Sequence, residues 1–235
     1  MRNFIALYFR ELENYFVTPI GYAILGSFWL ANGFFFSFNT LFISAVDMVN
    51  AFHNMSILLL LMVPLMTMRS FPEEYKQGTY ELLVSLGVRS WVMVISKFCA
   101  LLTLLFFMFL GSAVSVLVLV TFSEPDLGPI VGGYFGVTSL GAVFIAIGLL
   151  ISVFSSNQIV AAVLTWIALL ALWFLDYSTA LANSKFLSEV IIHLSLSVAY
   201  LDLIRGVIDL SVMTYFFSLI GFCLLAASTV LELRK

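Results

Sequence analysis

The sequence predicts an all-α integral membrane protein with six transmembrane helices, and three observations carry this prediction. First, 63% of the 235 residues are hydrophobic and only 10% are charged, whereas a soluble domain is about 45–50% apolar and about 25% charged. Second, the mean hydropathy is +1.13, and a globule of this length cannot bury so much apolar surface. Third, the apolar residues form continuous runs, which favours membrane helices over the alternating pattern of barrel strands. This composition excludes a soluble enzyme, a disordered chain and a nucleic-acid-binding protein.

The six predicted spans follow from run length, because a transmembrane helix needs roughly 20 mostly apolar residues to cross the ~30 Å hydrocarbon core. The qualifying stretches are Ile20–Ile43, Phe52–Met68, Phe98–Thr121, Ile130–Phe154, Ile159–Leu175 and Met213–Leu231. The second, fifth and sixth are the shortest. We expect one transmembrane domain over residues 1–235, with no cleavable signal peptide, because the first apolar run is too long for a signal-peptide core.

The basic residues predict the orientation of the bundle. Eight of the ten lysines and arginines precede the first span, lie between the second and third, or follow the sixth, and only Lys185 and Arg205 fall on the opposite side. By the positive-inside rule, both termini and the loop 69–97 are therefore cytoplasmic. An even number of spans agrees with two cytoplasmic termini.

Residues 1–18 are predicted to form an amphipathic helix in the plane of the lipid headgroups. One arc of such a helix carries Phe4, Ile5, Tyr8, Leu12, Tyr15 and Phe16. The opposite arc carries Arg2, Asn3, Arg10, Glu13 and Asn14. Glu11 falls at the edge of the apolar arc, and the pair Thr18-Pro19 breaks the helix before the first span. Two interpretations stay open: a simple interfacial anchor, or an elbow helix that also contacts a cytoplasmic partner.

The loop 69–97 is predicted to be a cytoplasmic helical hairpin. Ser70 and Glu73 have the spacing of a capping box at the start of a short helix. Gly78 is expected to end that helix, Thr79 to cap a second one, and Gly87 to stop it. The alternative is a loop whose charges serve only to solvate it.

The segment 176–212 is too apolar for a free loop and too interrupted for a span, which predicts external re-entrant or surface-lying helices between the fifth and sixth spans. Asp202, Arg205 and Asp209 have helical spacing that predicts local ion pairs, worth only tenths of a kcal/mol each. Glu189 and His193 are four residues apart, which favours a structural pair over a proton site.

A stripe of small residues opens the fourth span. Gly128, Gly132 and Gly136 recur every four residues, so they share one helix face. Small residues on such a face let helix backbones approach closely in a membrane. We therefore expect these glycines to pack against a neighbouring helix.

The sequence lacks the motifs of a self-sufficient transporter or enzyme. It contains no phosphate-binding loop, no Gly-x-Ser-x-Gly and no His-Glu-x-x-His. Cys99 and Cys223 lie in apolar runs and define neither a disulfide framework nor a zinc site. The spans also lack the central carboxylate or lysine that ion-coupled carriers usually need. We expect no catalytic residue, metal or cofactor in this chain, and an energised partner is implied.

The hairpin carries residues that resemble a known family, namely Glu73-Glu74, then Gly78-Thr79, then Glu81-Leu82-Leu83. This order between the second and third spans resembles the signature of ABC transporter permeases of the second exporter type, ABC type-2. Arg10-Glu11-Leu12 followed by Tyr15-Phe16 is similar to the elbow helix of that family. The later motifs are most similar to the gliding-motility-associated permeases, among them Gly132-Gly133-Tyr134, Ser155-Ser156-Asn157-Gln158 and Arg205-Gly206-Val207-Ile208-Asp209-Leu210. One position departs from the pattern, because Gly87 stands where the family usually has Pro.

The resemblance implies a membrane subunit that is not itself an enzyme, in the inner (cytoplasmic) membrane of a bacterium. Two ABC ATPase subunits, which bind ATP and Mg²⁺, would assemble with this chain and a second permease, either the same or a related chain. The surface that couples to the ATPase would be formed by Glu73, Glu74, Gly78, Thr79, Glu81, Leu82 and Leu83. The elbow helix, with Arg10, Glu11 and Tyr15, would contact the ATPase as well. The other expected partner is the lipid bilayer, and no nucleic acid is expected.

Two function classes remain beside an ATP-driven exporter. A structural or force-transmitting subunit of a motility or envelope-assembly complex would share the fold and the ATPase. An intramembrane enzyme is disfavoured because the chain lacks paired catalytic groups.

Overall fold

The structure of the chain is a computed structural model that describes residues 2–39, 48–122, 127–175, 194–206 and 209–234. Every regular element within these ranges is a helix, which confirms the predicted all-α class. The helices are α1 (Arg2–Val17), α2 (Pro19–Phe38), α3 (Met48–Thr67), α4 (Pro72–Gln77), α5 (Thr79–Ser85), α6 (Ser90–Phe122), α7 (Leu127–Phe154), α8 (Gln158–Trp173), α10 (Leu196–Ile204) and α11 (Leu210–Leu233).

Five helices among the described residues, α2, α3, α6, α7 and α11, are long and apolar enough to cross a membrane, so the chain is a multi-pass membrane protein. The predicted fifth span, Ile159–Leu175, corresponds to α8, which is also apolar but has only 16 residues. At 1.5 Å per residue α8 is about 24 Å long, shorter than the hydrocarbon core. The predicted third span, Phe98–Thr121, lies entirely within α6, which begins earlier, at Ser90, and includes Lys97.

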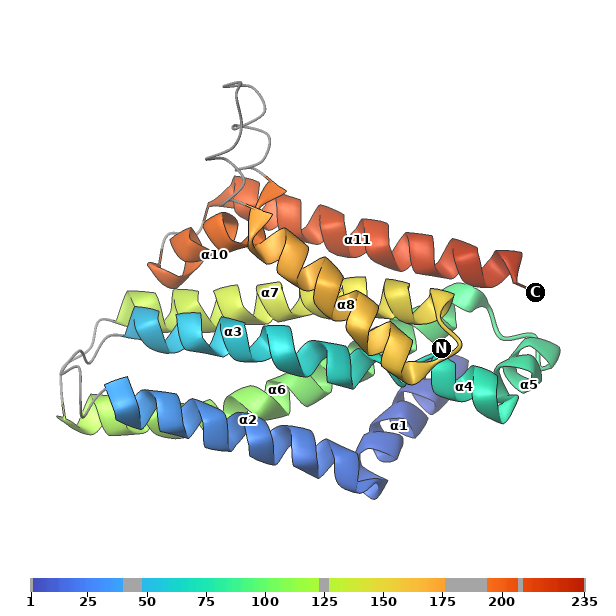
Figure 1. Cartoon of the computed structure of the whole chain (residues 1–235), viewed down its shortest axis with the longest axis horizontal. Coiled ribbons are helices and arrows are strands. Elements are labelled where there is room, and N and C mark those ends of the chain that lie inside the picture. Colours follow the sequence, from blue (N-terminus) through green and yellow to red (C-terminus); the bar gives the residue numbers. More distant parts are fainter. Residues whose placement is uncertain (1, 40–47, 123–126, 176–193, 207–208, 235) are drawn as a thin grey trace.

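The core of the bundle is α7, which packs against α3, α6, α8, α10 and α11 (Figure 1). Residues of α7 from Leu140 to Leu149 are almost all buried, since neighbours cover the helix on every side. Glycine permits this crowding: a methyl group at Gly148 would lie 2.4 Å from the Thr67 hydroxyl oxygen of α3. The short helices α4 and α5 project beyond one end of the bundle, toward which both chain termini also lie. This arrangement agrees with the predicted topology, in which these three parts share one side.

The predicted break between the elbow helix and the first span is confirmed. Thr18 is extended, with φ −86° and ψ 147°, and Pro19 begins α2. However, the predicted apolar arc, with Glu11 at its edge, is not the face of α1 that the bundle buries. The side chains of α1 that are buried are Leu7, Glu11 and Tyr15, four residues apart, so Glu11 lies in the middle of that face. The reason is a set of charged partners on other helices, described below.

The predicted hairpin is present as α4 and α5, and its two glycine stops are confirmed. Gly78 and Gly87 have φ values of +69° and +72°, in the left-handed region that favours glycine. The predicted capping box is wrong, because Phe71 precedes the first turn of α4 and no side chain caps it. Thr79 is likewise not a cap: Gly78 occupies that position, and Thr79 is the first residue of α5.

The glycine stripe of α7 lies against α10 and the turn after it. A methyl group at Gly132 would lie 2.8 Å from the Gly206 Cα, and one at Gly136 would lie 2.9 Å from the Leu203 Cβ. The third glycine of the stripe, Gly128, is itself in contact with Gly206, whose own Cβ would lie 3.3 Å from the Gly128 carbonyl carbon. The close approach expected of these residues is therefore made to α10 and its C-terminal turn.

The polar residues predicted on the external side divide into two sets. Glu189 and His193 lie outside the described residues. Among the ion pairs of the described part of the chain, none joins Asp202, Arg205 and Asp209. Asp209 lies beyond the end of α10, and its carboxylate instead accepts a hydrogen bond from the Ser211 backbone N–H at 2.9 Å, capping α11.

Candidate functional site

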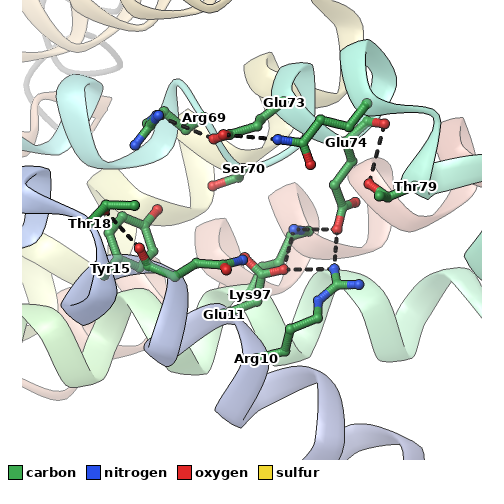
Figure 2. Close-up of a pocket in the computed structure, with 12 residues that line it drawn as sticks. Arg10, Glu11, Tyr15, Thr18, Arg69, Ser70, Glu73, Glu74, Thr79 and Lys97 are labelled. Atoms are coloured by element: carbon green, nitrogen blue, oxygen red, sulfur yellow. Dashed lines mark hydrogen bonds and ion pairs between the residues drawn. The ribbon is translucent and has the colours of Figure 1, made fainter.

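Four charged side chains from three helices meet where α1, α4 and α6 come together (Figure 2). The Lys97 Nζ of α6 lies 2.8 Å from the Glu11 Oε1 of α1 and 3.0 Å from the Glu74 Oε1 of α4. Arg10 of α1 also contacts both carboxylates, and its Nη2 lies 3.1 Å from the Glu11 Oε1. These four residues, the buried ion cluster, join α1 to segments that are 64 and 86 residues further along the chain.

The buried ion cluster is balanced in charge and largely removed from solvent. Glu11, Glu74 and Lys97 are 7%, 6% and 3% exposed, while Arg10 covers the open side. Desolvating a charge is costly unless an opposite charge and hydrogen bonds replace the water. Two cations and two carboxylates meet that need here. The match is incomplete, because the Arg10 Nε and the Glu74 Oε2 are buried without a hydrogen-bond partner.

The cluster sets the ionisation of Glu11. Burial alone would raise the pKa of this carboxyl, but the Lys97 ammonium and the Arg10 guanidinium outweigh burial and hold the pKa below its ordinary value of 4.5. Glu11 is therefore ionised at neutral pH, and its charge fastens α1 to α6.

Acidification is expected to release this fastening only at low pH. A carboxyl whose pKa is lowered by folding contributes stability above its unfolded pKa, and the contribution disappears as the pH falls through the folded pKa. We expect the unfolding free energy to be constant from neutral pH down to about 4.5 and to fall below that. Equilibrium unfolding in detergent at several pH values measures this, and Glu11→Gln should flatten the acidic decline. A decline of equal depth in that variant would contradict the assignment to Glu11.

A polar cavity of about 230 Å³ adjoins the buried ion cluster (Figure 2). It is lined by Arg10, Glu11, Asn14, Tyr15, Thr18, Arg69, Ser70, Glu73, Glu74, Gln77, Thr79 and Lys97. The Arg69 Nε pairs with the Glu73 Oε2 at 3.2 Å on its far side. Within the described residues no group of three or more His, Cys, Asp or Glu could hold a metal ion. The cavity lies between the elbow helix and the hairpin and is lined mostly by polar side chains.

The hairpin is also tied to the far side of the bundle. The Tyr80 hydroxyl donates a hydrogen bond to the Leu231 carbonyl oxygen of α11 at 3.0 Å, and the Tyr75 hydroxyl donates to the Val153 carbonyl oxygen of α7 at 3.2 Å. Together with the buried ion cluster, these contacts link α4 and α5 to α1, α6, α7 and α11. A displacement of the hairpin must therefore strain contacts with all four helices.

The outer face of the hairpin exposes apolar side chains. Leu82 is 59% exposed and Leu86 is 68% exposed, one helical turn apart. Glu81, next to Leu82 in the chain, and Gln77, at the end of α4, are also exposed, while Leu83 is buried. We call Gln77, Glu81, Leu82 and Leu86 the hairpin tip. Two neighbouring exposed leucines rimmed by polar groups are typical of a protein–protein contact.

The residues predicted to couple to a partner therefore fall into an exposed group and a buried group. Gly78, Glu81 and Leu82 are exposed, and Thr79 is half-buried. By contrast Glu74 and Leu83 are buried, and Glu73 is half-buried and paired with Arg69. The three elbow residues face inward: Arg10 and Glu11 join the buried ion cluster, and the Tyr15 hydroxyl donates to the Met66 carbonyl oxygen at 2.7 Å.

Sequence reasoning missed Lys97 and Arg69 as members of this site. The available signal was Lys97 itself, a lone cation followed by a long apolar run, because a charge in that position requires a buried partner. The site thus combines an exposed apolar tip with a buried cluster of four charged side chains. No protein-family model matches this chain, and no curated protein sequence matches it either.

Proposed function

We propose that this chain is the membrane subunit of an ATP-driven ABC exporter and that the hairpin tip is the surface on which a separate ATPase rests. The observation that carries the proposal is the pair of exposed leucines, Leu82 and Leu86, on a hairpin that is fastened to four helices. The resemblance of residues 71–86 to ABC type-2 permeases points to the same surface. In this proposal α8 is the fifth of six spans, and both termini lie in the cytoplasm of a bacterial cell.

The proposed mechanism passes movement from the hairpin to the spans. Closure of two ATPases on ATP and Mg²⁺ would displace α4 and α5 of this chain and of a second permease. Because Glu74 is held by Lys97 and Arg10, the displacement would reach α6 and α1 together. Tyr80 would carry it to α11 and Tyr75 to α7. The carboxylates of Glu73 and Glu74 thus act within the chain, and the contact with the ATPase falls to the hairpin tip.

The proposal predicts that charge at the tip detaches the ATPase. The double variant Leu82→Asp, Leu86→Asp should lose at least tenfold in bound ATPase, because it removes two central apolar contacts and places two unpaired carboxylates in their stead, and about 1.4 kcal/mol is tenfold in affinity. The measurement is co-purification of each ABC ATPase of the same organism, co-expressed with the tagged chain in its membrane.

Leu233→Asp serves as the matched control, since Leu233 is an 87% exposed leucine on α11 outside the hairpin. It should retain the ATPase. The proposal is wrong if no ABC ATPase binds the unaltered chain, or if the double variant retains as much ATPase as Leu233→Asp does.

A further inference from the structure

A second cavity, of about 500 Å³, lies between α2 and α6, within helices long enough to cross the membrane. Its lining is Trp29, Asn32 and Gly33 from α2 with Leu110, Gly111, Val114 and Ser115 from α6. Trp29, Leu110 and Val114 are 45%, 48% and 61% exposed, so the cavity opens on the outer surface of the bundle. A cavity of this size is within the range that holds a small ligand. We call it the α2–α6 cavity.

Close packing shapes the inner wall of this cavity. A methyl group at Gly111 would lie 2.2 Å from the Trp29 ring, so the glycine allows the indole to approach α6 closely. The Trp29 Nε1 donates to the Met108 carbonyl oxygen at 3.0 Å, which fixes the ring. At Gly33, by contrast, a methyl group would meet no atom within 4 Å. The cavity is thus closed by packed side chains at Trp29 and Gly111 and is open beside Gly33.

Two polar side chains lining the α2–α6 cavity have no partner among the described residues. Asn32 is 5% exposed and Ser115 is 8% exposed, yet neither side chain takes part in a hydrogen bond there. The nearby hydroxyl of Ser112, one turn earlier on α6, is satisfied, because its Oγ donates to the Phe109 carbonyl oxygen at 2.7 Å. Inside a bilayer an unpartnered amide or hydroxyl is costly because no water replaces the missing bond. These two groups therefore mark a place for a polar ligand group.

We propose that the α2–α6 cavity binds a neutral amphiphile from the bilayer, with a hydroxyl or amide head on Asn32 and Ser115 and its chain along the exposed apolar side chains. The Asn32 amide both donates and accepts, and the Ser115 hydroxyl does the same, which suits a head with hydroxyls. None of the described residues that line the cavity is ionisable, so a charged head would lose its hydration without gaining a counter-charge from them. The proposal concerns binding alone and does not depend on an ATPase.

Quenching of Trp29 fluorescence tests this binding in the full chain, reconstituted in nanodiscs of unbrominated phosphatidylcholine. The other three tryptophans, Trp91, Trp166 and Trp173, are replaced by phenylalanine. The probe is dibromostearoyl monoacylglycerol at a small mole fraction, compared with dibromostearic acid and a dibrominated alkane. We expect saturable quenching by the monoacylglycerol alone. If the triple variant does not fold, the same signal is the difference between the unaltered chain and Trp29→Phe.

Three variants assign the site. Asn32→Leu should weaken monoacylglycerol binding roughly tenfold, the loss expected for one hydrogen bond. Gly33→Leu should abolish the saturable signal by filling the cavity. Gly26→Leu is the matched control, because Gly26 lies two turns earlier on the same helix face, also meets no atom within 4 Å, and does not line the cavity. It should bind as the unaltered chain does.

Three results would overturn the proposal. One is equal quenching by all three probes, which indicates random contact with lipid. Another is binding that Asn32→Leu and Gly33→Leu leave unchanged. The third is Trp29 shielded from every probe in a dimeric chain, which indicates that a second copy covers the cavity.

Discussion

Replacing Lys97 with methionine is expected to lower the free energy of unfolding by about 3–5 kcal/mol, the cost typical of removing one partner from a buried ion pair. Methionine keeps nearly the same volume, so the packing beside Phe71, whose ring lies 5.2 Å from the Lys97 Nζ, is retained. The loss is electrostatic. Two buried carboxylates, Glu11 and Glu74, would be left to share the single cation Arg10. Equilibrium unfolding in mixed micelles of increasing dodecyl sulfate content measures the change.

A double variant separates the ion pair from the packing. In Glu11→Gln, Lys97→Met one cation and one anion leave together, and Arg10 still pairs with Glu74. The double variant should therefore be more stable than Lys97→Met alone, with a coupling energy above about 0.5 kcal/mol, as for groups in direct contact. Lys76→Met, at an exposed position of α4, should change stability by less than about 0.5 kcal/mol. Additive single effects would show that Glu11 and Lys97 do not interact.

The spans and the hairpin glycines were open to prediction because the forces that determine them are local. An apolar run long enough for the bilayer identifies a span without knowledge of its neighbours. A helix that must stop with positive φ favours glycine, as at Gly78 and Gly87. The capping box failed because tertiary contacts prevailed: Phe71 is fully buried, and Glu73 pairs with Arg69 instead of turning back to the helix start.

The buried ion cluster was beyond reach because its members come from separate helices. A helical wheel of residues 1–18 sorts each side chain by its preference for water or lipid. By that criterion a carboxylate such as Glu11 is not expected at the centre of a packed face. Its place there depends on Lys97, 86 residues later, and on Glu74. For the same reason, the sequence predicted that Glu74 lies on a surface for a partner, whereas its side chain is buried within the chain. A sequence shows which residues carry charge, whereas only the packing of α1, α4 and α6 shows which charges neutralise one another.

The largest steric effect is expected at the elbow, from Gly21→Ala. A methyl group at Gly21 would lie 2.1 Å from the Tyr15 carbonyl oxygen, and this neighbour is backbone that no side-chain rotation can move. The variant must therefore open the angle between α1 and α2. Opening it strains the Tyr15 hydrogen bond to Met66 and draws Glu11 away from Lys97. We expect a loss of about 3 kcal/mol, the upper part of the range for overpacking.

Gly26→Ala provides a control of opposite sign on the same helix. A methyl group at Gly26 meets no atom within 4 Å, so only the helix preference for alanine remains, which favours the variant by about 1 kcal/mol. The position of α1 is read from the rate at which a short bismaleimide cross-links Tyr8→Cys to Thr103→Cys, because the native side chains at these two positions are in contact, with their oxygens 2.8 Å apart. The chain used has Cys99 and Cys223 replaced by alanine. Gly21→Ala should slow this cross-link and Gly26→Ala should not. Equal cross-linking and equal stability in the two variants would mean that the contact between Gly21 and Tyr15 does not hold α1 in place. Displacement of the hairpin could then move α1 without moving α2.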